Sequence, residues 1–123
     1  MLKKIDSFFA GAELGKANIR NAEMLIKKLS EYSQNSVFLQ LFDSRAISST
    51  EQFFFAARHA TNAVSEGNSF SNRLEIELLL RITATRQIGK ALEIAGIKDG
   101  VQQIAIAGLS KDKKALESLV TSL

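Results

Sequence analysis

The stretch RITATRQIGKALEIAGIKDGVQQIAIAG, residues 81–108, contains a predicted helix and a predicted strand, two of the elements whose order indicates the fold class. In its first half, the apolar residues from Ile88 to Ala95 recur at i, i+3, i+4 and i+7, which predicts a short amphipathic helix. Gly96 is expected to end this helix in the left-handed conformation. After the turn KDG, the segment VQQIAIAG is predicted to be a strand. This helix and strand belong to the order of elements from which we infer the fold class.

The chain before this stretch carries further start and stop signals for helices. Ser48 with Glu51 three residues later is a capping box, and Gly67 is expected to end the helix that it opens. Asn72 with Glu75 repeats the start signal before LEIELLLRI, residues 74–82. The first half of that run also alternates like a strand, but consecutive leucines break the alternation, and we interpret it as a helix.

Both ends of the chain complete the order of elements. The segment IDSFFAGAEL, residues 5–14, is interpreted as a first strand or a hairpin edge, and VFLQLF, residues 37–42, as a buried strand. A helix is expected after Asn18, and a last one is expected to open at Ser110 and to carry an apolar side from Leu116 to the end. The order β-α-β-α-α-α-β-α predicts a single domain over 1–123, an α/β fold whose small sheet of about three to four strands is covered by about five helices.

Composition limits the classes of function. The chain has 123 residues, of which 46% are hydrophobic and 24% charged, as in a soluble globular protein. No apolar run reaches the roughly 18 residues of a membrane helix, so we expect a cytoplasmic protein without membrane contact. The absence of cysteine excludes disulfides, thiolate catalysis and cysteine-bound zinc. Neither a cofactor nor a metal is expected.

The residues that commonly carry catalysis are poorly placed here. The single histidine, His59, lies in the middle of a predicted helix, and no glycine-rich phosphate loop is present. Glu75 and Glu77 are two residues apart, so on a helix they point to different faces. We therefore predict a protein that is not an enzyme and has no small-molecule substrate.

Four cations around the helix at 88–95 indicate an anionic partner, which we interpret as RNA. These are Arg81, Arg86, Lys90 and Lys98. Arg86 is expected in the first turn, at the positive end of the helix dipole, where an anion is more favourable than a cation. A phosphate there would meet backbone N–H groups, Arg86 and Gln87. The alternative is that these are solvated cations without a partner.

Two further groups of residues leave two interpretations open. Arg73, Glu77 and Arg81 fall at i, i+4 and i+8, either as an ordinary ladder of ion pairs or as a surface that binds a partner protein. Phe54 and Phe55 lie outside the inner row of their helix. They are either buried between two layers or form an apolar docking patch.

Residues 68–100 resemble the PRPK-binding-protein family, the small kinase-binding accessory subunit of the KEOPS complex, and look most like its archaeal members. The matching features are Glu77, the pattern R-x-x-x-x-R-Q-I that runs from Arg81 to Ile88, Ala91, and the turn G-x-K-D-G that ends at Gly100.

This resemblance implies a non-catalytic subunit of the machinery that makes N6-threonylcarbamoyladenosine at position 37 of tRNA. Such subunits dock on a small atypical kinase/ATPase, stimulate it, and in archaea help to recruit tRNA by its 3′ CCA end. It makes Arg81, Arg86 and Gln87 the first candidates for RNA contact, because guanidinium groups bind phosphate and stack on unpaired bases. The chain is shorter than most relatives, so it is expected either to be minimal or to lack a C-terminal extension.

Overall fold

The computed structural model describes residues 2–5, 7–32 and 37–122, and in this part four strands form one antiparallel sheet in the order β1-β2-β4-β3. The strands are β1 (Leu2–Ile5), β2 (Phe8–Ile19), β3 (Val37–Asp43) and β4 (Gly100–Ser110). β1 and β2 form a hairpin, one of the two interpretations of the N-terminal segment. β4 lies between β2 and β3, so the strand after the decisive helix becomes an interior strand of the sheet.

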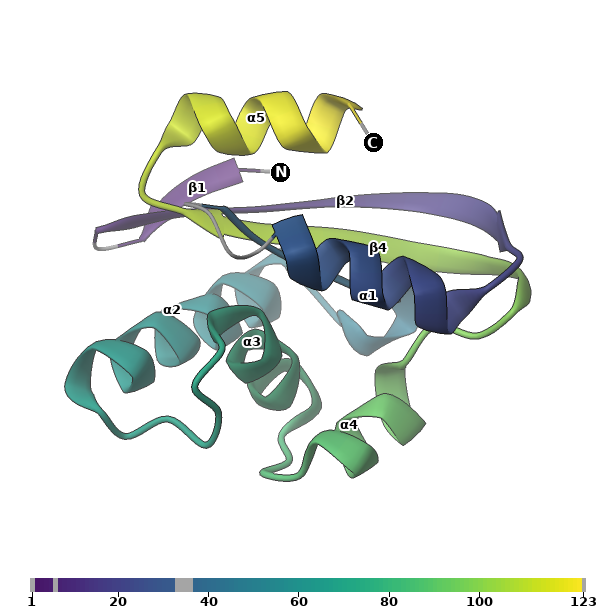
Figure 1. Cartoon of the computed structure of the whole chain (residues 1–123). Helices are drawn as coiled ribbons and strands as arrows, with labels where there is room; N and C mark the ends of the chain where they lie inside the picture. Colours follow the sequence, from purple (N-terminus) through teal and green to yellow (C-terminus); the bar gives the residue numbers. More distant parts are fainter. Residues whose placement is uncertain (1, 6, 33–36, 123) are drawn as a thin grey trace.

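Helices cover both faces of this sheet, which confirms the predicted fold class (Figure 1). One face carries α1 and α5, and the opposite face carries α2 and α3, with α4 beside α3. The helices are α1 (Ala22–Tyr32), α2 (Thr50–Glu66), α3 (Leu74–Thr83), α4 (Ile88–Ala95) and α5 (Lys113–Ser122), and a short 3-10 helix η1 (Ser44–Ala46) follows β3.

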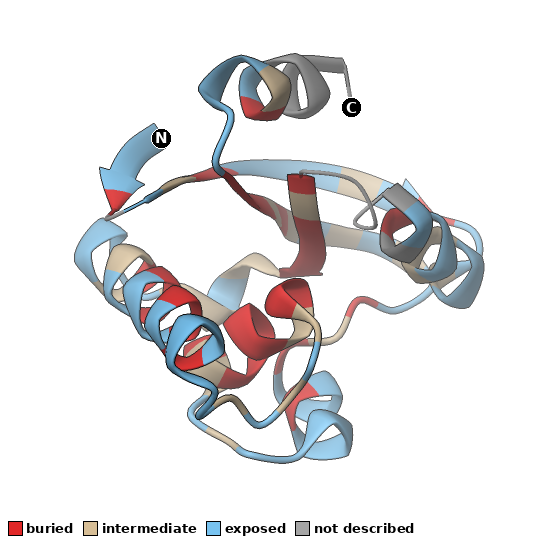
Figure 2. Cartoon of the chain, turned by 60° about the vertical axis from the view of Figure 1, so that its left-hand side comes forward, coloured by how far each residue is buried: buried red, intermediate tan, exposed pale blue. Residues whose placement is uncertain are grey.

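Alternation along the strands supplies one core on each side of the sheet. In β3, Leu39 and Leu41 face α1 and α5, whereas Phe42 faces α2 and α3. In β4, Ala105 and Ala107 are fully buried and belong to the core on the side of α2 and α3. Buried residues accordingly lie between the layers, while the outer sides of the helices are exposed (Figure 2).

The helix ends follow the predicted chemistry, but several of the predicted residues are wrong. Gly67 ends α2 in the left-handed conformation with φ 74°, as expected. Ser49, and not Ser48, caps the start of α2 and accepts the N–H of Gln52. Gly96 follows α4 with φ −66° in an extended conformation, which corrects the expected left-handed end.

The starts of α1 and α5 also differ from the predictions. Asn18 lies within β2, and the side chain of Asn21 accepts the N–H of Met24 instead. Asp99, in the turn before β4, accepts the N–H of Ala22 at 2.8 Å, so α1 is capped from a distant part of the chain. Ser110 is the last residue of β4, and Asp112 caps α5. Leu116 of the expected apolar side is buried, and the side chains of 118–123 lie outside the described residues.

Candidate nucleic-acid interface

The link between α2 and α3 places an aromatic ring over the side of α3. The left-handed turn at Gly67 lets the N–H of Asn68 bond to the carbonyl of Ala63 at 2.8 Å, which reverses the chain after α2. The following segment, residues 68–73, then leads into α3. It carries Phe70, whose side chain remains about half exposed although it is large and apolar.

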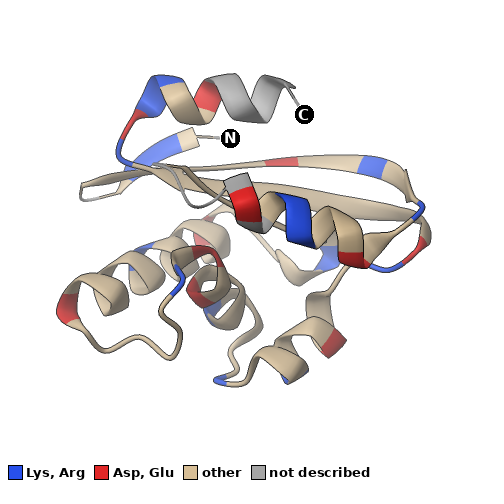
Figure 3. Ribbon diagram, in the orientation of Figure 1, with Lys and Arg blue, Asp and Glu red and all other residues tan. Residues whose placement is uncertain are grey.

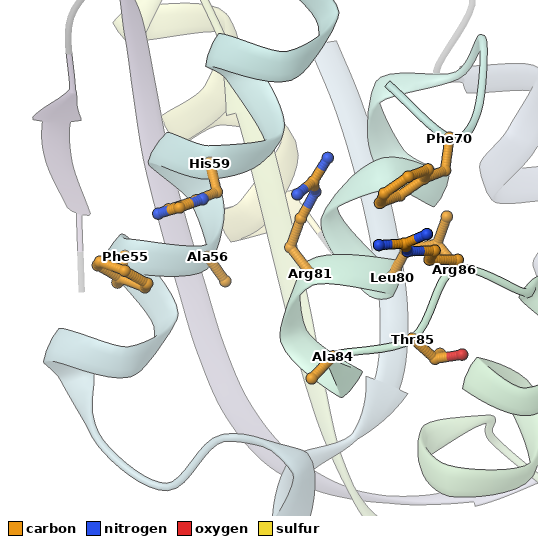
Figure 4. A pocket seen from close by; sticks show the side chains of 9 residues that line it. All are labelled: Phe55, Ala56, His59, Phe70, Leu80, Arg81, Ala84, Thr85 and Arg86. Atoms are coloured by element: carbon orange, nitrogen blue, oxygen red, sulfur yellow. The ribbon is translucent and has the colours of Figure 1, made fainter. Parts of the chain in front are cut away.

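A pocket of about 310 Å³ opens between α2, Phe70 and the α3–α4 link. On the α2 side, the rings of Phe55 and His59 contact each other at a tilt of 44°, with their centroids 4.3 Å apart. On the other side, the Phe70 ring lies 4.7 Å from the guanidinium carbon of Arg81 and 5.2 Å from that of Arg86. Figure 4 shows these side chains around the pocket. Aromatic and guanidinium planes on two sides of one pocket are suited to flat, electron-rich ligands.

Ala84 lies at the start of the link between α3 and α4 and has a strained backbone conformation. It ends α3 with φ 55° and ψ 40°, and it is the one non-glycine residue with positive φ in the described part of the chain. An L-residue with a Cβ disfavours this region by about 1–2 kcal/mol. This turn brings Thr85 and Arg86 back to the pocket instead of continuing the helix.

Arg81 is paired inside the protein, so the expectation of four uncompensated cations is wrong for this residue. Its Nη2 lies 2.8 Å and its Nε 2.9 Å from Oε2 of Glu77, whose side chain is fully buried. Arg81 itself keeps 23% of its side-chain surface exposed, on the pocket side. An arginine paired with a buried carboxylate is not available as a free charge.

Burial of Glu77 also corrects the interpretation of the charged row as an exposed surface. Arg73, which was expected to pair with Glu77, instead approaches Glu75 with its Nε 2.6 Å from Oε1. That contact is a close approach of charges without the alignment of a hydrogen bond. Glu75 is also buried, so both carboxylates of α3 act within the structure. The partner-binding role predicted for Arg73 and Glu77 has no exposed carboxylate to support it.

Arg86 retains the property that the sequence predicted. It is exposed, lies against Phe70, and forms no ion pair within the described residues. Its position differs from the prediction, because Gln87 is the cap of α4 and Arg86 precedes it instead of occupying the first turn. The N–H of Gln87 donates to Oγ1 of Thr85 at 3.3 Å, and no side chain caps the helix. Arg86 is therefore a charge at the rim of the pocket.

Lys90 and Lys98 are exposed, but the structure does not bring them into the pocket. Lys98 follows α4 and lies near the end of β3. There, a hydrogen bond from Arg45 lowers the pKa of Asp43 below its ordinary value, and the charge of Lys98 adds a smaller lowering. The cations are distributed along the molecule and do not form one compact patch (Figure 3).

Phe54 and Phe55 take different environments. Phe54 is half-buried, packs against the core, and meets Phe53 edge to face at 5.2 Å. Phe55 is 65% exposed and lines the pocket. Both also line a shallow groove of about 300 Å³ with Lys3 and Arg58.

Sequence reasoning missed Phe70, and it set His59 aside for catalysis without assigning it to a binding site. A usable signal was present, because Phe70 is the single aromatic residue in the polar segment NSFSN, residues 68–72. For His59, the signal was its spacing of four residues from Phe55, which places the two rings on one helix face. Within the described ranges, no cluster of three or more metal-binding side chains occurs, and no helix is long and apolar enough to cross a membrane.

Comparison with known proteins supports the resemblance seen in residues 68–100. A relative from Pyrococcus abyssi (strain GE5 / Orsay), named KEOPS complex subunit Cgi121, is 32% identical over 73 residues, which are 59% of this chain and 43% of that protein. The match therefore spans less than half the length of this curated relative. A family model described as kinase binding protein CGI-121 matches residues 17–123. Because this match includes most of the sequence, the chain belongs to the CGI-121 kinase-binding-protein family.

Proposed function

We propose that this chain is a non-catalytic KEOPS subunit that binds and activates the small kinase/ATPase of the complex and helps to recruit tRNA by its 3′ CCA end. The description of the family supports kinase binding, and the name of the Pyrococcus relative supports membership of KEOPS. The process would be the formation of N6-threonylcarbamoyladenosine at position 37 of tRNA, as the resemblance implies.

The guanidinium of Arg86 lies beside the aromatic pocket and forms no ion pair within the described ranges, and this observation carries the RNA part of the proposal. Proteins recognise single-stranded RNA by stacking unpaired bases on aromatic rings and guanidinium planes, while cations contact the phosphates. The 3′ end of tRNA is single-stranded and offers both groups. In this arrangement Arg86 contacts a phosphate at the rim, and Phe55, His59 and Phe70 surround a base.

The other residues predicted to contact RNA, Gln87, Lys90 and Lys98, lie outside the pocket. Gln87 follows Arg86 directly and offers its side-chain amide beside the rim, since that amide makes no capping hydrogen bond. Lys90 and Lys98 are exposed on α4 and after it, where they would attract more distant phosphates without entering the pocket.

The groove at Phe54 and Phe55 is the surface that we propose for the kinase. It combines apolar rings with the cations Lys3 and Arg58, and Lys3 lies over the Phe54 ring at 5.6 Å. A partly apolar groove with a charged rim resembles the composition of protein interfaces. Because Phe55 lines both the groove and the pocket, the two partners would bind side by side.

The test compares binding of intact tRNA and of tRNA trimmed of its CCA end, with and without the kinase. We expect binding that weakens with salt, is lost with the CCA end, and is lost in Arg86→Glu. Lys28→Glu is the matched control, because it makes the same change of charge at an exposed site on α1, on the other face of the sheet. Equal binding of intact and trimmed tRNA contradicts the RNA part of the proposal.

A second candidate is a purely protein-binding regulator of the kinase. The ion pair between Arg81 and Glu77 favours it, because this pair removes one of the cations expected to meet RNA. In that case tRNA does not bind at any salt concentration, and Arg86→Glu disrupts co-purification with the kinase.

A further inference from the structure

Glu77 holds two components of one side of the pocket although it does not line the pocket itself. Its Oε1 accepts the backbone N–H of Ser71 at 2.9 Å, and its Oε2 receives Nε of Arg81 at 2.9 Å. Ser71 follows Phe70 directly, and the Phe70 ring lies over the Arg81 guanidinium. One fully buried carboxylate therefore holds both the segment that carries the ring and the guanidinium beneath it.

This pairing restricts what Arg81 can do. If Arg81 turned towards a phosphate, Glu77 would remain as an unpaired charge in the interior, which is strongly unfavourable. Arg86 has no such restraint, since it forms no ion pair in the described part of the chain. The two arginines that contact the same ring thus differ in their freedom to bind an anion.

We infer that Glu77 is a positioning residue, which withholds Arg81 from phosphate binding and fixes its guanidinium plane, together with Phe70, as a stacking wall for a base. Phosphate recognition at the pocket is then left to Arg86. This inference rests on the proposed binding of tRNA at the pocket. It assigns the pocket's selectivity for an unpaired base to an internal carboxylate on α3.

The first experiment measures the salt dependence of tRNA binding by fluorescence anisotropy between 50 and 200 mM KCl, concentrations in the range where phosphate contacts dominate affinity. Each phosphate contact to a single strand contributes about 0.7 to the slope of log affinity against log salt. We expect Arg86→Met to reduce the magnitude of this slope by about 0.7. We expect Glu77→Gln to increase the magnitude by a similar amount, because the released Arg81 can reach a phosphate.

The second readout is the preference for intact over CCA-trimmed tRNA. Glu77→Gln should reduce this preference by roughly tenfold, about the effect of losing one stacked base. Glu75→Gln is the matched control, since Glu75 is also buried on α3 and near an arginine but does not line the pocket or contact Arg81. It should change neither the slope nor the preference.

A double variant, Glu77→Gln with Arg81→Met, keeps the inference testable if Glu77→Gln alone does not fold. It removes both charges of the pair and leaves neither of them buried without a partner. The inference requires the wild-type slope in this variant together with a reduced preference for the CCA end. A slope lowered as far as in Arg86→Met would show that Arg81 binds phosphate and would overturn the inference.

Two further outcomes separate this inference from the proposed function. If wild-type protein does not discriminate intact from trimmed tRNA, the proposed function fails and the inference fails with it. If wild-type protein discriminates but folded Glu77→Gln matches Glu75→Gln in slope and preference, the inference alone fails.

A measurement without RNA tests the same pairing by NMR. The Arg81 Nε–H should be protected from exchange in wild-type protein and in Glu75→Gln, and exposed in Glu77→Gln. Equal protection in all three proteins also contradicts the inference.

Discussion

Replacing Phe70 by alanine should weaken binding of tRNA while leaving the protein folded. The ring is 48% exposed and lies against Arg81 and Arg86. A stacked base is worth about 1–3 kcal/mol, which corresponds to a loss of roughly 5- to 150-fold in affinity. The loss should concern tRNA with an intact CCA end, because the pocket is proposed to receive an unpaired base of that end.

The cost of this substitution to folding is smaller than the stability of a typical domain. A half-buried phenylalanine contributes about 1 kcal/mol by burial, and each exposed cation–π contact adds about 0.5–1 kcal/mol. A chain of 123 residues is expected to have a free energy of unfolding of roughly 6–18 kcal/mol. Thermal unfolding should therefore show a folded variant that melts at a lower temperature.

The assay is titration of labelled tRNA, intact and trimmed, at one fixed salt concentration. Leu14→Ala serves as the control, since Leu14 is 62% exposed on β2 and lies outside the aromatic pocket. Phe70→Tyr should retain most of the affinity because it keeps the aromatic plane. Wild-type affinity in folded Phe70→Ala, or an equal loss for both forms of tRNA, would refute the assignment of the pocket to an unpaired base.

Four further substitutions test stability. Ala84→Gly should raise the free energy of unfolding by about 0.5–1 kcal/mol, because glycine tolerates φ 55°. Gly67→Ala at φ 74° should lower the free energy of unfolding by about 1 kcal/mol. A lower melting temperature for Ala84→Gly, or a higher one for Gly67→Ala, would contradict the respective prediction. Phe53→Ala should lower the free energy of unfolding by about 3–5 kcal/mol, since the ring is fully buried, and urea unfolding with a midpoint close to wild type would argue against this core position. The pKa of Asp43 is lowered below its ordinary value of 3.8, so the charged carboxylate contributes stability above that pH, and this stability is lost as the pH falls through the folded value. The free energies of unfolding of wild type and Asp43→Asn should therefore differ at neutral pH and converge in acid. A difference that stays constant with pH would exclude this linkage.

The order of elements could be predicted from the sequence because it depends on local periodicity. Apolar residues at helical spacing in 88–95 predicted a helix and the apolar segment 101–108 a strand, the whole order of elements indicated an α/β domain, and the strand became the interior strand β4. Helix ends were less certain. Several polar residues near each start can serve as the cap, so Ser48 was predicted where Ser49 caps.

The character of the candidate site was decided by tertiary structure. Spacing showed that Glu77 and Arg81 lie one helical turn apart, but it could not show that Ser71 bonds to Glu77, that Phe70 lies against Arg81, and that Glu77 is fully buried. The same folding left Arg86 without a carboxylate partner in the described residues. Helical periodicity is fixed by neighbours within a few residues, whereas the burial and pairing of a charge depend on which distant segment covers it, and that segment's position is set by the whole fold.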